Sequence, residues 1–379
     1  MIYFFAGFRF VAKQSPSDLY GETARMTLQT PRMKGNPMFR WHYINSKYMY
    51  IGIQLMSTAL ALSKGLTPSQ IICANPSLPY GGLSIASKTK ILERFNTRKQ
   101  FLHQQLIPRD MHLVDRKALA RSFLETNTYP IIAKPDRGVV GIGVRKIDSE
   151  NDLNDILNIM PSDYMLQQYC DYPLEYGIFF CKFPDEPRGT VVSLTQKIAP
   201  FVFGDGRHNV QQLVQINPDF KYNKDALLSH ARNLDYIPKK GAWYQVIIQG
   251  SHTYGSIFKD RNDQINKQLE SWLNELCAVD DEFYFGRFDM KVKDQEALKS
   301  GSGVKIIELN GCWSEPIHIY DDRHSLLFAF KELFLSYARA YHIAKLNKRR
   351  LQLKASFKEL LAAYRDYLQE KEQIMRVVG

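Results

Sequence analysis

Cysteine is scarce in this chain of 379 residues and follows no disulfide or metal-binding pattern. The five cysteines are odd in number and scattered, and no two of them form a CxxC pair. The pattern therefore implies neither a disulfide framework nor a zinc cluster, and it favours a reducing, cytoplasmic setting. The cysteines are Cys73, Cys170, Cys181, Cys277 and Cys312.

Hydrophobic runs long enough to span a membrane are also missing. The uncharged, mostly apolar run 48–63 falls short of the roughly 20 apolar residues that a span needs. We interpret it as part of a buried or half-buried helix over 47–64, and a helix lying on a membrane surface is the alternative. Residues 1–8 are apolar but carry neither a basic leader nor a cleavage site, so no secretory signal is expected.

The sequence has no aromatic-basic motif typical of an RNA-binding module, so no specific nucleic-acid partner is expected. The formal net charge of +11 is concentrated at the two ends. Residues 1–50 carry seven basic against two acidic residues, and residues 331–379 carry eleven against five. Such basic ends are usually solvated surface, and contact with an anionic membrane surface is the alternative. The part between them is neutral.

The chain does contain enough apolar material for two or three cored units, since 45% of its residues are hydrophobic. After an irregular stretch over 1–45, helix-like and strand-like patterns alternate, which predicts the α+β class. Strands are expected at 71–74, 131–134, 143–147, 164–169, 177–183, 190–197, 245–248, 285–292 and 304–309. Helices are expected at 47–64, 88–104, 151–160, 210–216, 263–279, 326–346 and 351–375.

One stretch joins a strand to a glycine-rich turn. Lys134 and Pro135 end the strand, and Gly138, Gly141 and Gly143 follow. Glycine permits positive φ and close approach, so backbone N–H groups of such a turn can close on phosphate oxygens. The ammonium of Lys134 would point at the same phosphates. For the turn alone, an ordinary hairpin with permissive glycines is the alternative.

A second stretch supplies oxygen ligands. Asp289 lies in one strand-like run, Glu308 follows nineteen positions later in another, and Asn310 is two residues beyond Glu308, on the same face of its strand. Magnesium prefers hard oxygen ligands and is usually held by one or two carboxylates plus substrate phosphates. Acids at the edge of a sheet are the alternative, but acids within apolar strands are costly without a cation. Together the two stretches indicate an ATP-using enzyme.

Taken in chain order, these elements resemble the ATP-grasp superfamily, and most of all its carboxylate-amine ligases, such as D-alanine:D-alanine ligase and the cyanophycin synthetase and glutamate ligase branch. The resemblance covers residues 84–320 and is carried by eight separated elements. These are Lys88, Lys134-Pro135, the glycine turn, Gln167-Gln168-Tyr169-Cys170, Glu175, Lys197, Arg287-Phe288-Asp289 and Glu308-Leu309-Asn310.

The resemblance implies an ATP-grasp fold, in which two α+β subdomains clasp ATP. The expected domains are a reduced N-terminal region over 1–83, an ATP-grasp domain over 84–330 and a basic helical tail over 331–379. Within the ATP-grasp domain, the lid subdomain is expected over about 125–170 and the metal-binding subdomain over about 171–330.

The resemblance also implies a role for each matched residue. The nucleotide would be held by Lys88 and Lys134 at its phosphates, by Gln167, Gln168, Tyr169 and Cys170 at its adenine, and by Glu175 at its ribose. Many members carry a glutamate where this chain has Gln167. Lys197 would lie near the γ-phosphate, and Mg²⁺, with Mn²⁺ as the alternative, would be held by Asp289, Glu308 and Asn310. Arg287 would stabilise the oxyanion of the tetrahedral intermediate, where a fixed guanidinium favours the transition state.

Substrate residues are less well defined. Arg207 and His208 follow a Gly-Asp-Gly sequence that resembles a loop of the cyanophycin synthetase branch, and they could contact the γ-phosphate or a carboxylate substrate. A glycine turn that caps a helix at Asn209 is the alternative. Ser314 and Glu315 are expected to orient the acceptor amine, although Glu315 could equally form a structural salt bridge.

The sequence therefore predicts an ATP- and Mg²⁺-dependent ligase that joins a small-molecule or peptide carboxylate to an amine through an acyl phosphate. Two alternatives stay open: an ATP-binding scaffold or regulator with degenerate catalysis, and a phosphoryl transferase on the same fold. The identity of the two substrates and the oligomeric state are left open.

Overall fold

The computed structural model describes residues 46–138, 141–221, 223–231, 233–248, 250–353 and 356–378. These residues form two compact units, a smaller one over Ala199–Ile248 and a larger one that contains the remainder. The irregular stretch predicted over 1–45, which includes most of the expected N-terminal region, lies outside the described residues.

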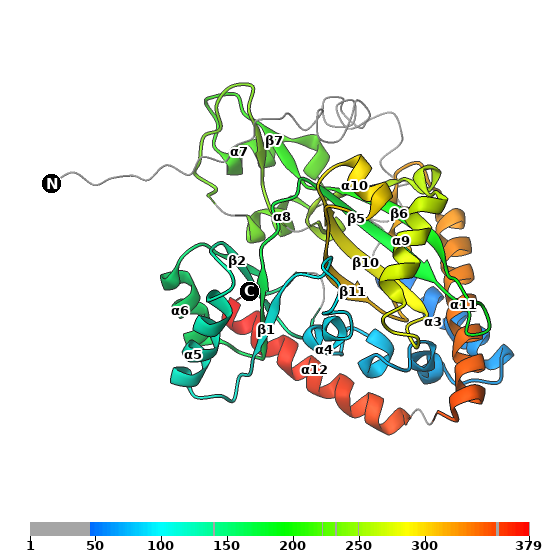
Figure 1. Ribbon diagram of the computed structural model, residues 1–379. Helices are drawn as coiled ribbons and strands as arrows, with labels where there is room; N and C mark the ends of the chain where they lie inside the picture. The colour runs from blue at the N-terminus through cyan, green and yellow to red at the C-terminus, as the bar shows by residue number, and fades with distance from the viewer. Residues whose placement is uncertain are drawn as a thin grey trace. The chain divides into compact units, whose positions relative to one another are not determined.

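The larger unit contains a four-stranded antiparallel sheet, here called the lid sheet, with strand order β1-β4-β2-β3 (Figure 1). Its apolar side chains pack with those of two helices, α5 (Leu113–Leu124) and α6 (Glu150–Ile159), in one core cluster. The strands are β1 (Gln104–Ile107), β2 (Ile131–Pro135), β3 (Arg145–Ile147) and β4 (Tyr164–Gln168). The lid sheet is therefore an α+β layer with its own core.

A second, five-stranded sheet, here called the central sheet, has the order β11-β10-β5-β6-β9 and is antiparallel throughout. Its strands are β5 (Leu174–Cys181), β6 (Thr190–Ile198), β9 (Ile257–Asp260), β10 (Phe285–Val292) and β11 (Val304–Asn310). The helices α9 (Lys267–Cys277) and α10 (Gln295–Ser300) and the short turns η6 (His252–Tyr254), η7 (Asn262–Gln264) and η8 (Ile317–Tyr320) belong to the same unit. The mixed helix and sheet content confirms the predicted α+β class.

Alternation along the strands gives the central sheet two different faces. On one face, Tyr176, Ile178 and Phe288 are completely buried. The other face is divided along its length. At one end it joins a core cluster with α3 (Ser46–Ser63), η3 (Pro68–Ala74) and α11 (Leu326–Leu351) through residues such as Phe179 and Phe285. At the other end it carries charged side chains, which form the candidate site.

The turn η4 (Pro79–Gly82) and the short helix α4 (Lys88–Glu93) precede the lid sheet, and a long helix, α12 (Phe357–Val378), closes the described chain. The red ribbon of α12 runs below α4 and reaches the lid sheet in Figure 1. The predicted C-terminal helical tail is thus present, although α12 begins later than the expected 351. No helix of the described part is long and apolar enough to cross a membrane.

The smaller unit pairs β7 (Phe201–Phe203) with β8 (Trp243–Gln245) in an antiparallel hairpin-like ladder. Between these strands lie α7 (Val210–Ile216), η5 (Pro218–Phe220) and α8 (Lys224–His230). Asn209 caps α7, since its side chain accepts a hydrogen bond from the backbone N–H of Gln212 and Gln212 bonds back to the Asn209 backbone.

Two predicted elements of the larger unit are wrong or only partly right. The run 71–74 is the end of the 3₁₀ helix η3, not a strand, because Pro68 follows the capping residue Thr67, whose backbone N–H is bonded by Gln70. The predicted helix 88–104 ends at Glu93, and Gln104 pairs with Gln167 at the start of β1. In the smaller unit, the predicted strand 245–248 overlaps the observed strand β8 only at Gln245, where β8 ends.

Candidate active site

The glycine turn joins two antiparallel strands, β2 and β3, so it is a hairpin turn and not a strand-to-helix phosphate loop. Gly138, Gly141 and Gly143 have φ values of +133°, +72° and +75°, which L side chains rarely adopt. A Cβ on Gly143 would also lie 2.9 Å from Pro135. Glycine is therefore required at these positions by the backbone itself.

Two lysines lie beside the turn and are held by neutral acceptors. Lys88 donates through Nζ to the carbonyl of Gly138 at 2.7 Å. Lys134 donates through Nζ to Gln167 Oε1 and to the carbonyl of Ile307, both at 3.0 Å. Within the described residues, neither ammonium has a carboxylate at ion-pair distance. The second bond of Lys134 also links the lid sheet to β11 of the central sheet.

Loss of water around these two ammoniums lowers the pKa of each. Loss of water lowers the pKa of Lys134 to about 8, against the opposing attraction of Glu308. Burial also lowers the pKa of Lys88, again opposed by Glu308 and Asp136. A charge removed from water without a counter-ion costs free energy. A polyanionic ligand at the turn would supply the missing negative charge for both lysines.

The charged end of the central sheet holds an alternating chain of ion pairs. Lys291 Nζ lies 3.0 Å from Glu175 Oε2, and Lys197 Nζ lies 3.3 Å from Glu175 Oε1 and 3.0 Å from Asp289 Oδ1. Arg287 then bonds Asp289 in the bidentate manner, Nε to Oδ1 at 3.0 Å and Nη2 to Oδ2 at 3.1 Å. The strand register produces this chain, because Glu175 lies directly between Lys197 on β6 and Lys291 on β10.

The chain of ion pairs keeps both acids ionised. Burial alone would raise the pKa of Asp289, but Arg287 and Lys197 outweigh it and lower that pKa to about 2. The pKa of Glu175 is lowered likewise, because Lys291 and Lys197 outweigh its burial. Asp289 also accepts a hydrogen bond from the amide of Asn310 at 3.1 Å, which leaves the Asn310 carbonyl oxygen available to a ligand.

Glu308 differs from the other acids of the site. It lies directly opposite Asp289 in the β10–β11 ladder and is only half-buried. Among the described residues its carboxylate forms no hydrogen bond or ion pair, although it acts electrostatically on Lys88, Lys134 and Arg287. A carboxylate without a direct partner among the described residues, near the end of a strand and beside a paired aspartate, can accept a cation.

The donor chemistry therefore fits magnesium. Asp289, Glu308 and Asn310 present carboxylate and amide oxygens from adjoining strands, and Mg²⁺ usually takes one or two carboxylates and completes its shell with phosphate oxygens and water. No group of three His, Cys, Asp or Glu side chains in the described part could hold a metal by itself.

The predicted adenine hinge lies at the end of β4. The side chain of Gln167 is buried and is engaged with Lys134, while Gln168 is exposed and its backbone N–H donates to the carbonyl of His103 at 2.9 Å. Tyr169 is half-buried, with the ammonium of Lys146 5.3 Å from its ring centre. Cys170 is half-buried and its thiol is free. Gln167 therefore supports the ammonium of Lys134 in this structure.

The predicted acceptor residues lie next to Arg287. Its Nη1 donates to the carbonyl of Glu315 at 3.1 Å, and the Glu315 carboxylate accepts from the hydroxyl of Tyr320 at 2.6 Å. Ser314 instead donates back to the carbonyl of Gly311 at 2.6 Å, so its hydroxyl closes a turn. The Glu315 carboxylate thus forms no salt bridge within the described residues, and the loop that bears it is fixed to Arg287.

The structure places Arg207 and His208 in the smaller unit, which is described by itself. Both backbone N–H groups bond Asp205 Oδ1 at 2.8 Å, and His208 Nδ1 lies 2.5 Å from Asp205 Oδ2. Hydrogen bonds to His208 and the two backbone N–H groups lower the pKa of the Asp205 carboxyl. Their local role is therefore to shape the loop before the cap of α7, and their role toward a substrate stays a prediction.

Three residues of the site were missed from the sequence. Lys291 follows Asp289 by two positions on the same face of β10, and this spacing was a usable signal. Asp136 is buried and accepts from both the backbone and the hydroxyl of Thr89, at 2.9 and 2.7 Å, which ties α4 to the end of β2. Tyr320 was not foreseen because only the fold brings it to Glu315.

The chain has structural likenesses but no matches by sequence. No protein-family model matches it, and no curated protein matches it. A bifunctional glutathione synthetase from Pasteurella multocida is 18% identical, with a TM-score of 0.35, over 65% of this chain and 36% of that one. The VanG D-Ala:D-Ser ligase from Enterococcus faecalis is 13% identical, with a TM-score of 0.40, over 70% of this chain and 63% of that one.

A D-alanine–D-alanine ligase from Bacillus anthracis is 14% identical, with a TM-score of 0.40, over 73% of this chain and 71% of that one. D-alanine ligases, which the motifs resemble, are thus among the solved structures of similar fold. The chain spans about a third of the length of the glutathione synthetase and under two thirds of that of the VanG ligase. At these identities and TM-scores the likenesses carry no information on what this chain binds or does, which rests on its own residues.

Proposed function

We propose that this protein is an ATP- and Mg²⁺-dependent ligase that joins a carboxylate to an amine through an acyl phosphate. The observation that carries the proposal is the pair of lysines, Lys88 and Lys134, held beside a glycine turn by neutral acceptors. A buried and a half-buried ammonium, neither with a counter-ion among the described residues, favour a polyphosphate. The strand ends opposite them present Asp289 and Glu308, the oxygen donors that a magnesium-bound polyphosphate requires.

In this proposal Asp289, Glu308 and the side-chain amide oxygen of Asn310 would hold the cation, which would neutralise charge on the phosphates when bound. Mn²⁺ could replace it, since both ions accept the same oxygen ligands. The backbone N–H groups of the glycine turn and the two lysines orient the triphosphate. Lys197, already paired with Glu175 and Asp289, is expected near the γ-phosphate.

The proposed reaction consists of two displacement steps. A carboxylate oxygen of the first substrate attacks the γ-phosphorus, and the bond to the β-phosphate oxygen breaks to release ADP. The amine nitrogen of the second substrate then attacks the acyl carbon, inorganic phosphate leaves, and the amine gives up a proton to form the amide. Arg287, fixed by Asp289 on one side and by the Glu315 carbonyl on the other, is expected to face the oxyanion of the second step, and these two bonds support that role.

The substrates are proposed to be small molecules or peptides. The Glu315 carboxylate, held by Tyr320, would suit a cationic amine before it loses its proton. The five free cysteines agree with a reducing, cytoplasmic setting.

Oxygen-isotope transfer tests the proposal directly. Purified protein is incubated with MgATP, a panel of amines and ¹⁸O-labelled carboxylic acids, and the phosphate released is examined by mass spectrometry. A ligase acting through an acyl phosphate transfers one ¹⁸O atom to phosphate and releases ADP. A product heavier by a phosphoryl group would indicate a phosphoryl transferase instead, and ATP binding without turnover on any pair would indicate a scaffold.

A further inference from the structure

Helix α12 buries one side against the segment that leads into Lys88. Its residues Ala363 and Tyr367 are 9% and 5% exposed and form a small core with Ile85, against which Leu83 and Leu360 pack. Ile85 lies three positions before Lys88, and the Lys88 backbone N–H is in turn bonded to the carbonyl of Asp136 at 2.9 Å. The helix therefore supports the segment that carries one of the two site lysines.

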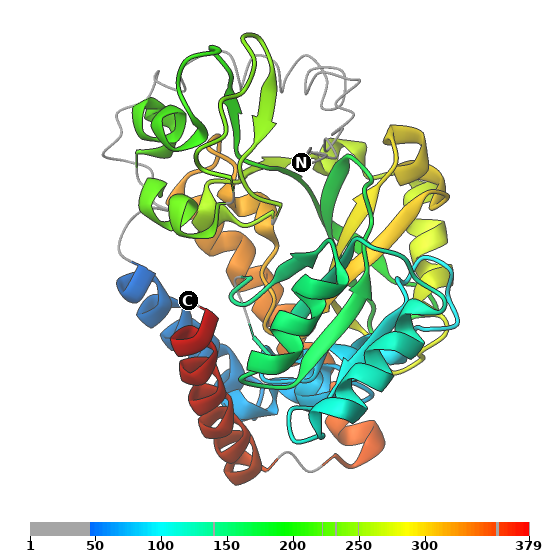
Figure 2. The same cartoon turned by 90° about the vertical axis from the view of Figure 1, so that its left-hand side faces the viewer.

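The end of α12 also contacts the lid sheet and its glycine turn. A Cβ on Gly143 would lie 3.1 Å from Cγ2 of Ile374, which is 4% exposed, so the helix packs directly on this glycine. Gln373 accepts a hydrogen bond from Arg109 at 2.7 Å, and Glu370 lies 3.8 Å from Arg137. Figure 2 shows the red end of α12 next to the strands of the lid.

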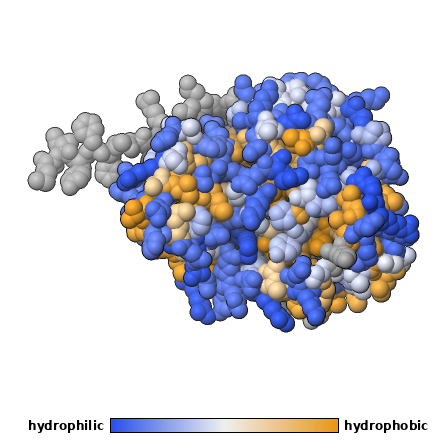
Figure 3. Space-filling view, turned by 60° about the horizontal axis from the view of Figure 1, so that its bottom comes forward, coloured by the Kyte–Doolittle hydropathy of each residue, from blue (hydrophilic) through white to orange (hydrophobic). Residues whose placement is uncertain are grey.

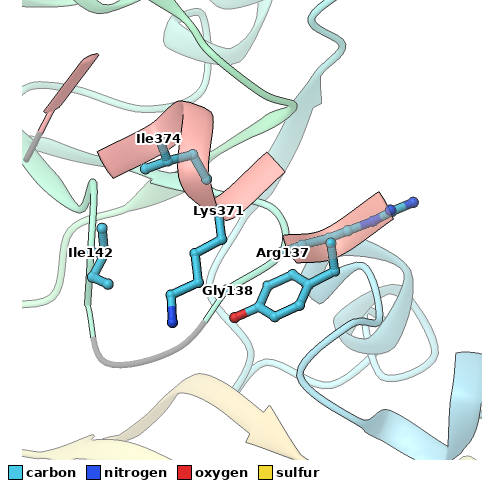
Figure 4. Close-up of a pocket in the computed structure, with 6 residues that line it drawn as sticks. Arg137, Gly138, Ile142, Lys371 and Ile374 are labelled. Carbon is cyan, nitrogen blue, oxygen red and sulfur yellow. The ribbon is translucent and has the colours of Figure 1, made fainter. Parts of the chain in front are cut away.

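These contacts enclose a small pocket between the helix and the turn. It is lined on the turn side by Gly138 and Ile142, and on the helix side by Tyr367, Lys371 and Ile374. In Figure 4 the side chains of Lys371 and Ile374 extend from α12 toward Ile142 and the turn. The face of the turn away from the central sheet is thus covered by side chains of α12.

We propose that α12 is a positioning element of the nucleotide site, in which Tyr367 and Ile374 hold the turn of Gly138 and Gly143 in the conformation that receives phosphate. The inference rests on the proposed function for the identity of the ligand. Three glycines at positive φ have many other conformations open to them, so a loop of this kind loses much entropy when a ligand fixes it. A helix that fixes it beforehand reduces that loss and raises affinity.

Coupling of this kind is reciprocal. If docked α12 raises the affinity for MgATP, bound MgATP must stabilise the docking of α12 by the same factor. The side of α12 that faces solvent offers matched controls, because Leu368 and Met375 are 44% and 53% exposed on the same helix. Hydrophobic side chains are visible between polar ones on this lower face of the molecule in Figure 3.

The test compares full-length variants by two measurements. Tyr367→Ala and Ile374→Ala are expected to raise the dissociation constant of MgATP, measured by calorimetry, by about tenfold or more. In the same variants without nucleotide, amide hydrogen exchange of residues 136–144 is expected to accelerate, while exchange in β5 and β10 stays unchanged. The controls Leu368→Ala and Met375→Ala should leave both quantities as they are, and Tyr367→Phe and Ile374→Val should restore them.

Unchanged affinity and unchanged exchange in Tyr367→Ala and Ile374→Ala would overturn the inference. Accelerated exchange throughout the larger unit would also overturn it, since α12 would then only stabilise the fold. If the unaltered protein binds no nucleotide, the proposed function fails, and the exchange of the turn without nucleotide still decides whether α12 positions it.

Discussion

Asp289 and Glu308 lie opposite each other, yet the structure predicts that their substitution has very different effects on stability. Asp289 is 3% exposed and accepts from Lys197, from two nitrogens of Arg287 and from Asn310. Glu308 forms no such bond among the described residues. Comparison of Asp289→Asn with Glu308→Gln therefore separates the structural role of a carboxylate from a ligand-binding role at one site.

The size of the expected difference follows from the contacts. Asp289→Asn keeps the shape but removes the charge shared by the half-buried Arg287 and the buried Lys197, and leaves Lys197 with Glu175 alone. Removal of one partner from a buried ion pair destabilises by about 3–5 kcal/mol. Glu308→Gln removes only longer-range attractions of a half-buried group, for which about 1 kcal/mol or less is expected. Against a total stability of about 5–15 kcal/mol, only the first change is severe.

Thermal and urea unfolding of the two variants at pH 7 provide the measurement. The melting temperature of Asp289→Asn is expected to fall by roughly 6–15 °C and that of Glu308→Gln by roughly 0–3 °C. Because Glu308→Gln is expected to stay folded, a loss of its activity reports on catalysis and not on unfolding. The Mg²⁺ concentration that gives half-maximal activity should rise in this variant. A variant Asp289→Asn that is as stable as the unaltered protein would refute the ion-pair chain as the support of this sheet face.

Three further predictions concern charge at the site and near it. Arg287→Lys keeps a positive charge but loses the fork that bonds Asp289 and the Glu315 carbonyl, so kcat should fall by about 10²–10³-fold with little change in KM for ATP. Burial sets the Lys134 pKa at about 8, and only the charged form attracts phosphate. MgATP affinity measured by calorimetry should therefore fall as pH rises above 8, by up to about tenfold per pH unit, and Lys134→Met should remove that dependence. Burial lowers the pKa of His318 to about 4, whereas its unfolded pKa is about 6.5. The protein should therefore lose stability as pH falls from 6.5 toward 4. In His318→Asn, the urea midpoints of unfolding at pH 7 and pH 5 should lie closer together than in the unaltered protein.

The sequence could place several candidate residues on common strand faces, because strand periodicity acts over short distances. Arg287 and Asp289, and likewise Glu308 and Asn310, are separated by two positions, which places each pair on one face of a strand whatever the fold. The glycines predicted a turn with positive φ, and Gly138, Gly141 and Gly143 have positive φ in the structure. These inferences needed no knowledge of which strands are neighbours.

The partners of these residues depended on register, which local patterns do not specify. Glu175 meets both Lys197 and Lys291 only because β5 lies between β6 and β10. In the same way Gln104, the last residue of the predicted helix 88–104, belongs to a strand because it pairs with Gln167 of β4, 63 positions away in the chain. The short apolar run 71–74 fits a strand and a helix equally well, and the Thr67-Pro68 start signal was the feature that should have decided it.

The candidate site has two parts, one in which the charged side chains are paired with each other and one in which they have no oppositely charged partner among the described residues. Glu175 and Asp289 are neutralised by the protein's own cations, so neither carboxylate needs a ligand to balance its charge, and Asp289 adds only an oxygen to the proposed cation site. Lys88 and Lys134 are bonded only to neutral oxygens, and Glu308 has no direct partner among the described residues. A magnesium-bound polyphosphate carries both missing charges at once, an anion for the lysines and a cation for the glutamate. Neither free Mg²⁺ nor a phosphate alone supplies both, so binding of the two should be cooperative, and the metal-free nucleotide should bind more weakly than MgATP.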